Sequence, residues 1–381
     1  MPASDPAPMT APLRVAVLGA GTVGREVVRA FLERPEALRP ADGRPLELVG
    51  VAVRDLDRAA ARGIPAALLT DAPAHLVASP EVDVVVELLG GEEPARTLIA
   101  AALERGRGVV TANKHVLAHH GSELEALARR SVAALRFEAA VGGGIPVLSP
   151  LAADLAGDVV ERVRGIVNGT TNYILSAMSD EGRAYADVLA DAQAAGYAEA
   201  DPTADVEGLD AANKLVVLAR LAFGAWLPPG DVALRSPRVD ERAGAPGITG
   251  VTAEDIVAAA AQGRVLKLIA TAARAADGVE GSVAARVVVT AVPLGSPFGR
   301  TSGVLNRIEV EARPLGTVAF SGPGAGGPAT SSAILADLRA IARGLGSTFA
   351  GLPEAGVGRI VAAPARGHLE APSGARYPLD D

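Results

Sequence analysis

A short apolar run, Leu13–Leu18, leads directly into a glycine turn and then into an amphipathic pattern that extends to Leu32. A strand, a tight glycine turn and a helix in this order are typical of a dinucleotide-binding βα unit. The same order also occurs as a plain glycine turn in unrelated α/β proteins. We interpret it as a dinucleotide site in which the helix N-terminus faces the phosphates. The residues of the turn are Gly19, Ala20, Gly21, Thr22, Val23 and Gly24.

The alternation of strands and helices continues beyond this turn. Apolar runs predict strands at Leu46–Val53, Asp83–Leu89 and Gly108–Thr111, and Pro94 is placed to open a helix. This pattern predicts an α/β fold, a Rossmann-type doubly wound parallel sheet. Ligands of such sheets bind at the carboxyl ends of the strands, where Lys114 lies. This lysine either contacts substrate or cofactor or is a solvated surface residue.

The second predicted strand is followed by Arg54 and Asp55. An acidic residue at this position usually binds the ribose 2′-hydroxyl of NAD, whereas an arginine suits the 2′-phosphate of NADP. Because Arg54 comes first, NADP is favoured over NAD, and use of both cofactors stays open.

Three consecutive glycines lie in the segment Val141–Pro146, just after a predicted strand at Ala133–Ala139. Glycines permit an irregular backbone that turns several carbonyl groups toward one point. With the Glu138 carboxylate, these carbonyls are in principle a site for a hard cation. From the residues alone, an interdomain hinge is the favoured interpretation.

Beyond Pro146 the pattern changes to helices followed by consecutive strands, which predicts a second, α+β domain with one mixed or antiparallel sheet. The predicted strands are Val159–Val167, Val265–Ala270, Ala285–Val292, Ile308–Glu311 and Thr317–Phe320. The predicted helices begin at Tyr173, Tyr185, Thr252 (with a capping-box pattern) and Thr330, and a loop is expected over residues 228–250.

These patterns suggest four segments. Residues 13–140 form the nucleotide-binding domain, and residues 141–320 form the substrate-binding, catalytic and dimerisation domain. Residues 321–344 are a glycine loop and a helix that return to the nucleotide domain, and residues 345–381 are a weakly ordered tail.

Polar residues follow the predicted strand at Val159–Val167. They read Asn-Gly-Thr-Thr-Asn over residues 168–172, and their hydroxyls and exposed amides are suited to a substrate carboxylate. Thr170 is the candidate substrate-binding residue of this group.

The stretch Glu199–Lys214 contains five acidic residues and one lysine ahead of a long apolar run. Apolar residues at three- and four-residue steps predict a helix with one face against a core. The residues of this face are Leu209, Ala212, Val216, Ala219 and Phe223. Asp210 and Lys214 are four residues apart on that helix and project from one face. A lysine held near carboxylates is a plausible proton donor or acceptor, and an ordinary surface ion pair is the alternative.

Composition excludes several functional classes. The net charge is −8 without a basic run, which argues against nucleic acid or an anionic membrane as partner. The absence of cysteine excludes disulfides and thiolate catalysis. No stretch is suited to cross a membrane, and the first dozen residues lack the features of a signal peptide, so we expect a cytoplasmic protein that acts on a small molecule.

Several motifs together resemble the homoserine dehydrogenase family. The resemblance extends from Val15 to about Leu345, and its acidic block with the lysine is far more specific than the glycine turn. It implies a nicotinamide-dependent interconversion of aspartate 4-semialdehyde and homoserine, on the route to threonine and methionine. The motifs are GAGTVG at 19–24, TANK at 111–114, EAAVGGGIP at 138–146, NGTTNYIL at 168–175, GYAEADPTADVEGLDAANK at 196–214 and GPGAGG at 322–327.

The resemblance also implies roles for individual residues. Lys214 would exchange a proton with the substrate oxygen, and Asp210 would hold the substrate hydroxyl and this lysine together. Glu199 would bind the substrate ammonium group, with Asp205 nearby.

Cofactor and cation roles follow in the same way. Lys114 would reach the junction of cofactor and substrate, and Gly326 would approach the cofactor. The family forms homodimers, with the mixed sheet as the expected contact. A monovalent cation, sodium or potassium, would be held by Glu138, Val141, Gly143 and Ile145.

Many members of this family add a C-terminal regulatory domain that senses threonine. About 37 residues follow the last matched helix, too few for that domain, so we expect no threonine inhibition through it and no kinase-like region before Leu13. Two alternatives stay open: a related two-domain NAD(P) oxidoreductase acting on another amino or semialdehyde acid, and a non-catalytic nucleotide-sensing Rossmann protein.

Overall fold

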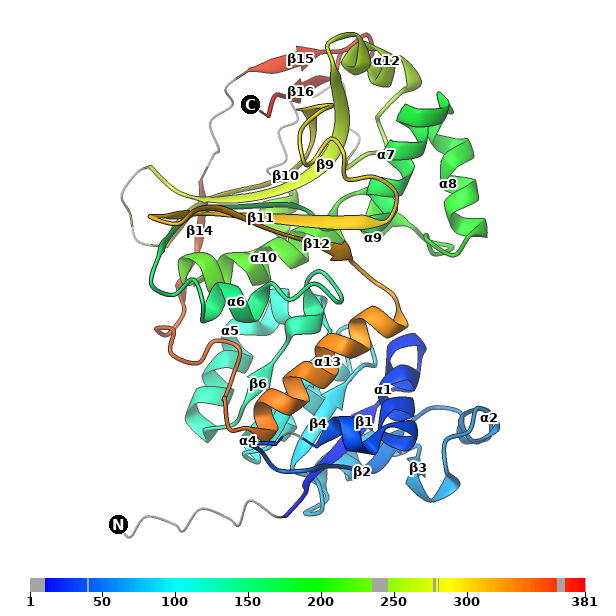
Figure 1. Ribbon diagram of the computed structural model, residues 1–381, viewed down its shortest axis with the longest axis vertical. Helices are drawn as coiled ribbons and strands as arrows, with labels where there is room; N and C mark the ends of the chain where they lie inside the picture. Colours follow the sequence, from blue (N-terminus) through cyan, green and yellow to red (C-terminus); the bar gives the residue numbers. More distant parts are fainter. Residues whose placement is uncertain are drawn as a thin grey trace. The chain divides into compact units, whose positions relative to one another are not determined.

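The computed structural model describes residues 11–39, 41–234, 246–276, 279, 281–361 and 367–380. The first ten residues and the middle of the predicted 228–250 loop lie outside this description. The chain forms two compact units (Figure 1). Unit 1 comprises residues 1–152 and 325–352, and unit 2 comprises residues 153–324 and 353–381.

Unit 1 contains a six-stranded sheet in the order β3-β2-β1-β4-β5-β6, and all its pairs are parallel. The order changes direction between β1 and β4, which is the switch point of a doubly wound fold. This confirms the predicted Rossmann-type sheet. The strands are β1 Leu13–Leu18, β2 Leu46–Ala52, β3 Leu69–Thr70, β4 Val84–Glu87, β5 Gly108–Thr111 and β6 Leu135–Arg136.

Helices flank this sheet, and α13 packs against α1 although about 300 residues separate them in the chain (Figure 1). Apolar side chains of α13, among them Ile334 and Leu338, belong to the same buried core as Val15 and Val17 of β1. The helices of unit 1 are α1 Thr22–Glu33, α2 Leu56–Ala61, α3 Pro73–Ala78, α4 Ala95–Glu104, α5 Lys114–Ser131, α6 Leu148–Ala152 and α13 Gly327–Ala342, with short 3-10 turns η1 Pro35–Leu38, η2 Ala66–Leu68 and η3 Glu138–Ala140.

The strand predicted at Ala133–Ala139 ends early, at Arg136, and Glu138 opens the turn η3. The reason is a long-range bond: the Glu138 N–H donates to Asp337 of α13 (2.8 Å).

Unit 2 is built on a mixed six-stranded sheet in the order β12-β11-β7-β9-β10-β14. Its pairs are antiparallel except for the parallel pair β10–β14, which confirms the predicted α+β architecture. The strands are β7 Val159–Ile166, β9 Arg264–Arg274, β10 Ser282–Pro293, β11 Leu305–Arg313, β12 Gly316–Pro323 and β14 Arg359–Val361.

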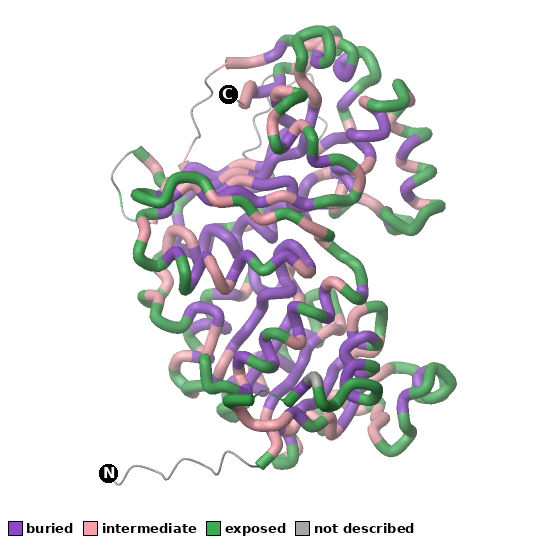
Figure 2. Tube along the Cα trace, viewed as in Figure 1, coloured by how far each residue is buried: buried purple, intermediate pink, exposed green. Residues whose placement is uncertain are grey.

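Helix α10 is buried on nearly every side, which corrects the one-sided helix expected from the sequence (Figure 2). Every residue from Asp210 to Leu221 is buried, while Leu209, predicted to face the core, is 41% exposed. The cause is packing against the sheet and also against α11 and β8. The helices of unit 2 are α7 Gly169–Glu181, α8 Tyr185–Ala194, α9 Thr203–Val206, α10 Leu209–Phe223, α11 Pro229–Leu234 and α12 Ala253–Ala261, and α12 begins with the predicted capping box.

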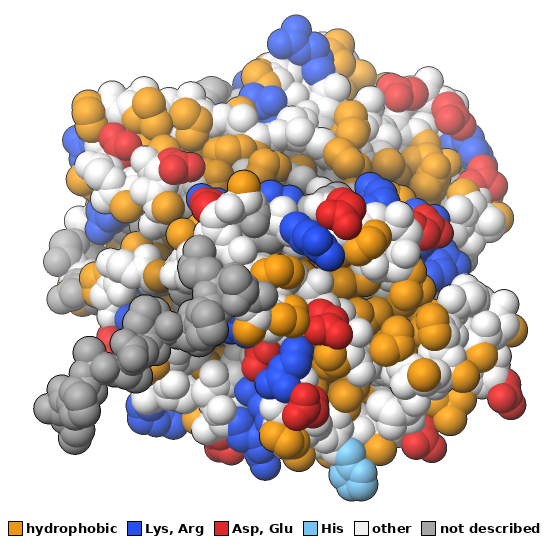
Figure 3. All heavy atoms as spheres, turned by 60° about the horizontal axis from the view of Figure 1, so that its bottom comes forward, with side chains coloured by type: hydrophobic (Ala, Val, Ile, Leu, Met, Phe, Trp, Pro, Cys, Tyr) orange, Lys and Arg blue, Asp and Glu red, His pale blue; other side chains and the backbone are white. Residues whose placement is uncertain are grey.

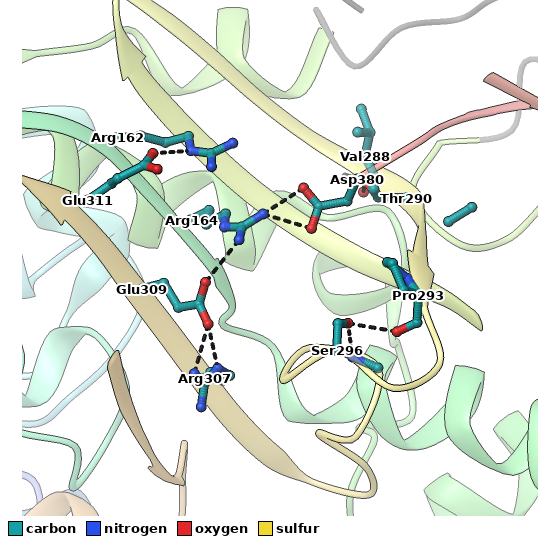
Figure 4. Close-up of polar contacts among 12 residues, drawn as sticks. Arg162, Arg164, Val288, Thr290, Pro293, Ser296, Arg307, Glu309, Glu311 and Asp380 are labelled. Carbon is teal, nitrogen blue, oxygen red and sulfur yellow. Dashed lines mark hydrogen bonds and ion pairs between the residues drawn. The ribbon is translucent and has the colours of Figure 1, made fainter. Parts of the chain in front are cut away.

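The segment expected to be a weakly ordered tail contains the strands β13 Gly356–Val357, β14, β15 His368–Glu370 and β16 Arg376–Pro378. Strand β13 pairs with β8 Ala225–Trp226, which precedes the tail in the chain. Asp380 explains part of this order, because Arg164 of β7 donates to both of its carboxylate oxygens (2.6 and 2.7 Å). Glu309 of β11 accepts from the same arginine and from Arg307 (Figure 4).

No described helix has the length and hydropathy needed to cross a membrane. On the face shown in Figure 3, acidic and basic side chains are interspersed with apolar ones.

Candidate functional site

The glycine turn between β1 and α1 has two kinds of glycine. A Cβ atom on Gly24 would lie 1.9 Å from the Gly19 carbonyl oxygen, so only glycine allows the helix to approach the strand this closely. Gly19 itself has a φ of +99°. At Gly21 a Cβ atom would meet nothing within 4 Å, and this residue precedes α1 without a side-chain cap. The turn therefore combines tight internal packing with an open backbone surface at the start of a helix.

The second glycine loop lies against the first. A Cβ atom on Gly327, the first residue of α13, would come 2.8 Å from the Thr22 carbonyl oxygen. Gly326 precedes the helix with a φ of +105°, a conformation that residues with a side chain rarely adopt. The structure thus brings Gly326 to the neighbourhood of the predicted dinucleotide turn.

A buried polar network follows the carboxyl ends of β4 and β5. Glu87, which was not among the residues predicted from the sequence, accepts from the Thr111 hydroxyl (2.6 Å) and from the Leu89 N–H (2.8 Å). Burial raises the pKa of the Glu87 carboxyl. Asn113 caps α5, and the half-buried Lys114 is the first residue of that helix. Lys114 is therefore positioned by the cap at the ligand-binding edge of the sheet.

Arg54 and Asp55 are both exposed at the end of β2. Asp55 caps α2 by accepting from the Arg58 N–H (2.9 Å). One of its oxygens is thus engaged in the fold, and Arg54 beside it is exposed.

In unit 2 a lysine is buried among oxygen atoms. Lys214 Nζ donates to Asp210 Oδ2 (2.6 Å) and to the Val167 carbonyl oxygen (2.7 Å). The Asn168 amide donates to Asp210 Oδ2 (2.9 Å) and to Asp205 Oδ1 (2.7 Å). Lys214 is 9% and Asp210 8% exposed, so this pair is not the solvated surface pair considered as the alternative.

Helix α10, the end of β7 and helix α9 build this cluster, and α9 supplies Asp205. We call it the lysine cluster: Lys214, Asp210, Val167, Asn168 and Asp205. Helix α10 supplies Asp210 and Lys214, which are four residues apart and project from one face of the helix. The end of β7 supplies Val167 and Asn168, and the Asn168 side chain also caps α7 by accepting from the Thr171 N–H (2.8 Å). Burial is the main cause that raises the pKa of Asp205, and the nearby Asp210 charge adds to it.

Asn168 is a cluster residue that the sequence analysis did not name individually. Its signal was present, because an asparagine at the end of a strand and before a helical pattern is a preferred N-cap. What the signal could not show is that the amide on the same side chain bridges two carboxylates.

Residues 168–172 are more buried than the exposed amides expected from the sequence. They begin α7, and Thr170, Thr171 and Asn172 are all buried. The Thr170 hydroxyl donates to the Tyr197 carbonyl oxygen (2.7 Å), so its proton is engaged within the fold. Glu199, by contrast, is exposed two residues beyond Tyr197.

The candidate cation loop fits a cation through its carbonyls and not through the Glu138 carboxylate. Gly142 and Gly143 have positive φ angles of 73° and 58°, and both are buried, as are Val141 and Ile145. Among described residues, no backbone N–H donates to the carbonyl oxygens of Val141, Gly143 or Ile145. The Glu138 carboxylate is already engaged, because it accepts bonds from residues 147–149. Buried carbonyls without donors are suited to a hard cation.

A dinucleotide-type glycine turn in one unit and a buried lysine–carboxylate cluster in the other define an NAD(P)-dependent oxidoreductase. Two sequence-family profiles match the chain: homoserine dehydrogenase, NAD binding domain, over residues 19–138, and homoserine dehydrogenase over residues 146–338. The chain belongs to the homoserine dehydrogenase family.

Individual relatives agree with this assignment. Homoserine dehydrogenase of Mycobacterium tuberculosis is 48% identical over 92% of this chain and 78% of its own length. That of Bacillus subtilis is 38% identical over 89% and 76%. The crystal structure of a homoserine dehydrogenase from Thiobacillus denitrificans superimposes with a TM-score of 0.82 at 39% identity, over 93% of this chain and 80% of that one. A hyperthermophilic archaeal homoserine dehydrogenase in complex with NADPH has a TM-score of 0.67 at 25% identity, over 86% and 97%.

Proposed function

We propose that this chain interconverts L-aspartate 4-semialdehyde and L-homoserine, with Lys214 as the proton-transfer residue. The observation that carries this proposal is the lysine cluster, in which the Lys214 ammonium and the Asp210 carboxylate are 2.6 Å apart and shielded from water. Reduction of an aldehyde needs an acid at the oxygen that becomes an alkoxide, and a lysine is ordinarily protonated at neutral pH. In the direction of alcohol oxidation the same lysine has to accept the proton.

The other cluster residues keep this lysine in place. Asp210 and the Val167 carbonyl direct two of the Lys214 N–H groups, which leaves one N–H for the substrate oxygen. In this proposal Asp210 also accepts from the substrate hydroxyl. Asn168 positions Asp210 by donating to the oxygen that Lys214 uses.

Substrate binding is assigned to the exposed end of the same acidic stretch. Glu199 is exposed, and its carboxylate carries the negative charge that a substrate ammonium group requires. Asp205 adds a second, half-buried acid. Thr170 contributes through its backbone at the start of α7, since its hydroxyl already donates to Tyr197.

The cofactor is assigned to unit 1 and supplies the hydride. Residues 19–24 and the N-terminus of α1 bind its pyrophosphate, with Gly21 as the open contact. Arg54 favours NADP over NAD, because its exposed guanidinium suits a 2′-phosphate and Asp55 is engaged as a helix cap. Lys114 reaches the junction of cofactor and substrate, and Gly326 approaches the cofactor.

The proposal has three further parts. The carbonyls of the 141–146 loop, with that of Glu138, bind sodium or potassium. The enzyme is a homodimer through the mixed sheet of unit 2, which analytical ultracentrifugation would test. It acts in the cytoplasm, which a fluorescent fusion would test.

The decisive experiment follows the consumption of NADPH and of NADH with aspartate semialdehyde, for the wild type and for Lys214→Ala. We expect turnover, faster with NADPH, that falls by about 10³-fold in the variant while NADPH binding is retained. Wild-type turnover only with an analogous semialdehyde would support the related-oxidoreductase alternative. Cofactor binding without any turnover would support a nucleotide-sensing protein, and an active Lys214→Ala would remove the assigned role of the lysine.

A further inference from the structure

The candidate cation loop is held from both ends by one side chain. Glu138, at the entry of the loop, accepts bonds through its carboxylate from the N–H groups of Val147, Leu148 and Ser149 (2.7, 2.8 and 2.7 Å) and from the Ser149 hydroxyl (2.5 Å). The exit of the loop is therefore tied back to its entry. This closes residues 141–146 into a ring whose carbonyls have few other conformations available.

Helix α13 provides the support for this ring. Asp337 accepts the Glu138 N–H through Oδ2 (2.8 Å) and Arg136 Nε through Oδ1 (2.7 Å). Arg136 also donates to the Ser149 hydroxyl oxygen (3.3 Å). On the other side of the loop, a Cβ atom on Gly144 would lie 2.9 Å from the Ala329 carbonyl oxygen, so the loop is pressed against the same helix.

The charges of this network are not balanced. Asp337 is 1%, Glu138 4% and Arg136 7% exposed. When ionised, these three groups carry two negative charges and one positive charge, which leaves one net negative charge away from water. A buried charge without compensation is costly, and a monovalent cation on the neighbouring carbonyls compensates it.

We propose that Asp337 is a positioning residue for cation binding, acting through Glu138 on the carbonyls of the 141–146 loop. Asp337 orients Glu138 and compensates the charge of Arg136, so that the negative charge of Glu138 stays uncompensated until a cation binds. The inference rests on the cation site included in the proposed function, and it assigns to α13 a role that the loop residues alone do not reveal.

The test measures the thermal unfolding temperature at pH 8 as sodium or potassium replaces tetramethylammonium at constant ionic strength. We expect a saturable rise for the wild type. In Asp337→Asn the cation concentration at half-effect increases by at least about tenfold, because the amide removes one charge and presents N–H to Arg136. The matched control is Glu125→Gln, which changes another buried carboxylate of unit 1, paired with Arg129 in α5, and which should keep the wild-type midpoint.

A milder variant guards against a failure of Asp337→Asn to fold. Ser149→Ala removes one donor to Glu138 and the Arg136 contact, and we expect a midpoint raised about threefold. An unchanged midpoint in every folded variant overturns the role of Asp337 while the cation site stands. A wild type without any cation response removes the site itself together with this inference, and the dehydrogenase reaction is judged separately by the turnover assay.

Discussion

Two lysines are buried in unit 2, and their surroundings differ. Lys214 at the start of α10 has a carboxylate as its partner, Asp210 at 2.6 Å, and an adjoining exposed acidic stretch. Lys267 in β9 is 3% exposed and donates to the neutral oxygens of Asn172 (2.9 Å) and Ser176 (2.8 Å) of α7. Burial therefore does not by itself distinguish a lysine suited to chemistry from one that holds a helix to a sheet.

The two lysines differ in how well their surroundings stabilise the protonated side chain. Desolvation lowers the pKa of Lys267 to about 8, and the distant Asp180 offsets this only in part. Its partners, Asn172 and Ser176, are themselves buried. The sequence contains only three lysines, Lys114, Lys214 and Lys267.

The largest expected effect separates the two lysines directly. Lys214→Met should lower kcat by about 10³-fold, because it removes the group that exchanges the proton. Lys267→Met is the matched control and should change kcat by less than about tenfold, since this side chain only anchors α7. Steady-state kinetics with NADPH binding measured in parallel checks both. A comparable loss of kcat in the two variants would mean that burial and not proton transfer explains the effect.

The next largest expected effect is a pH dependence of the free energy of unfolding, which arises from Lys267. Its pKa is about 8 when folded and about 10.4 in the unfolded chain, so between these values the unfolded state binds more protons. The cost of burying the charged lysine is fully present below pH 8 and is relieved as the pH rises. The free energy of unfolding of the wild type should gain up to about 3 kcal/mol relative to Lys267→Met between pH 8 and 10.5. Urea unfolding across this range measures it, and a difference independent of pH would contradict the assignment.

A smaller effect tests the partner of Lys214. Asp210→Asn removes the charge that holds the ammonium group and should lower kcat by about 10²-fold. Asp201→Asn makes the same exchange at an exposed position of the acidic stretch and should leave kcat unchanged. If the two variants behave alike in steady-state assays, the acidic stretch acts through its general charge and not through the Asp210 contact.

The smallest effect divides the two roles of Asn168. Asn168→Ser and Asn168→Ala both lose the amide that bridges Asp205 and Asp210, so we expect kcat to fall about tenfold in both. Serine still caps α7 whereas alanine does not, so alanine should be less stable than serine by about 1 kcal/mol. Kinetics and urea unfolding of the pair separate these effects. Wild-type kcat in Asn168→Ser would show that the bridge has no role.

Much of unit 1 was predictable because its signals are local. The strand β5 and the glycine turn were found at their observed positions, since each is encoded by adjacent residues. The use of Glu138 was not predictable in the same way. Its carboxylate was a candidate ligand by sequence, but the N–H groups that occupy it belong to Val147 and to the first two residues of α6, about ten residues later.

The sequence alone determined where the backbone must turn tightly and which residues lie four apart on one helix. Gly24 and the Asp210–Lys214 pair are examples, because steric exclusion and helical periodicity act between near neighbours. Only the tertiary structure decided the partners of buried polar groups. Asn168 meets Asp210 across 42 residues and Lys267 meets Asn172 across 95, since burial makes each polar group bond to whatever the fold brings within reach.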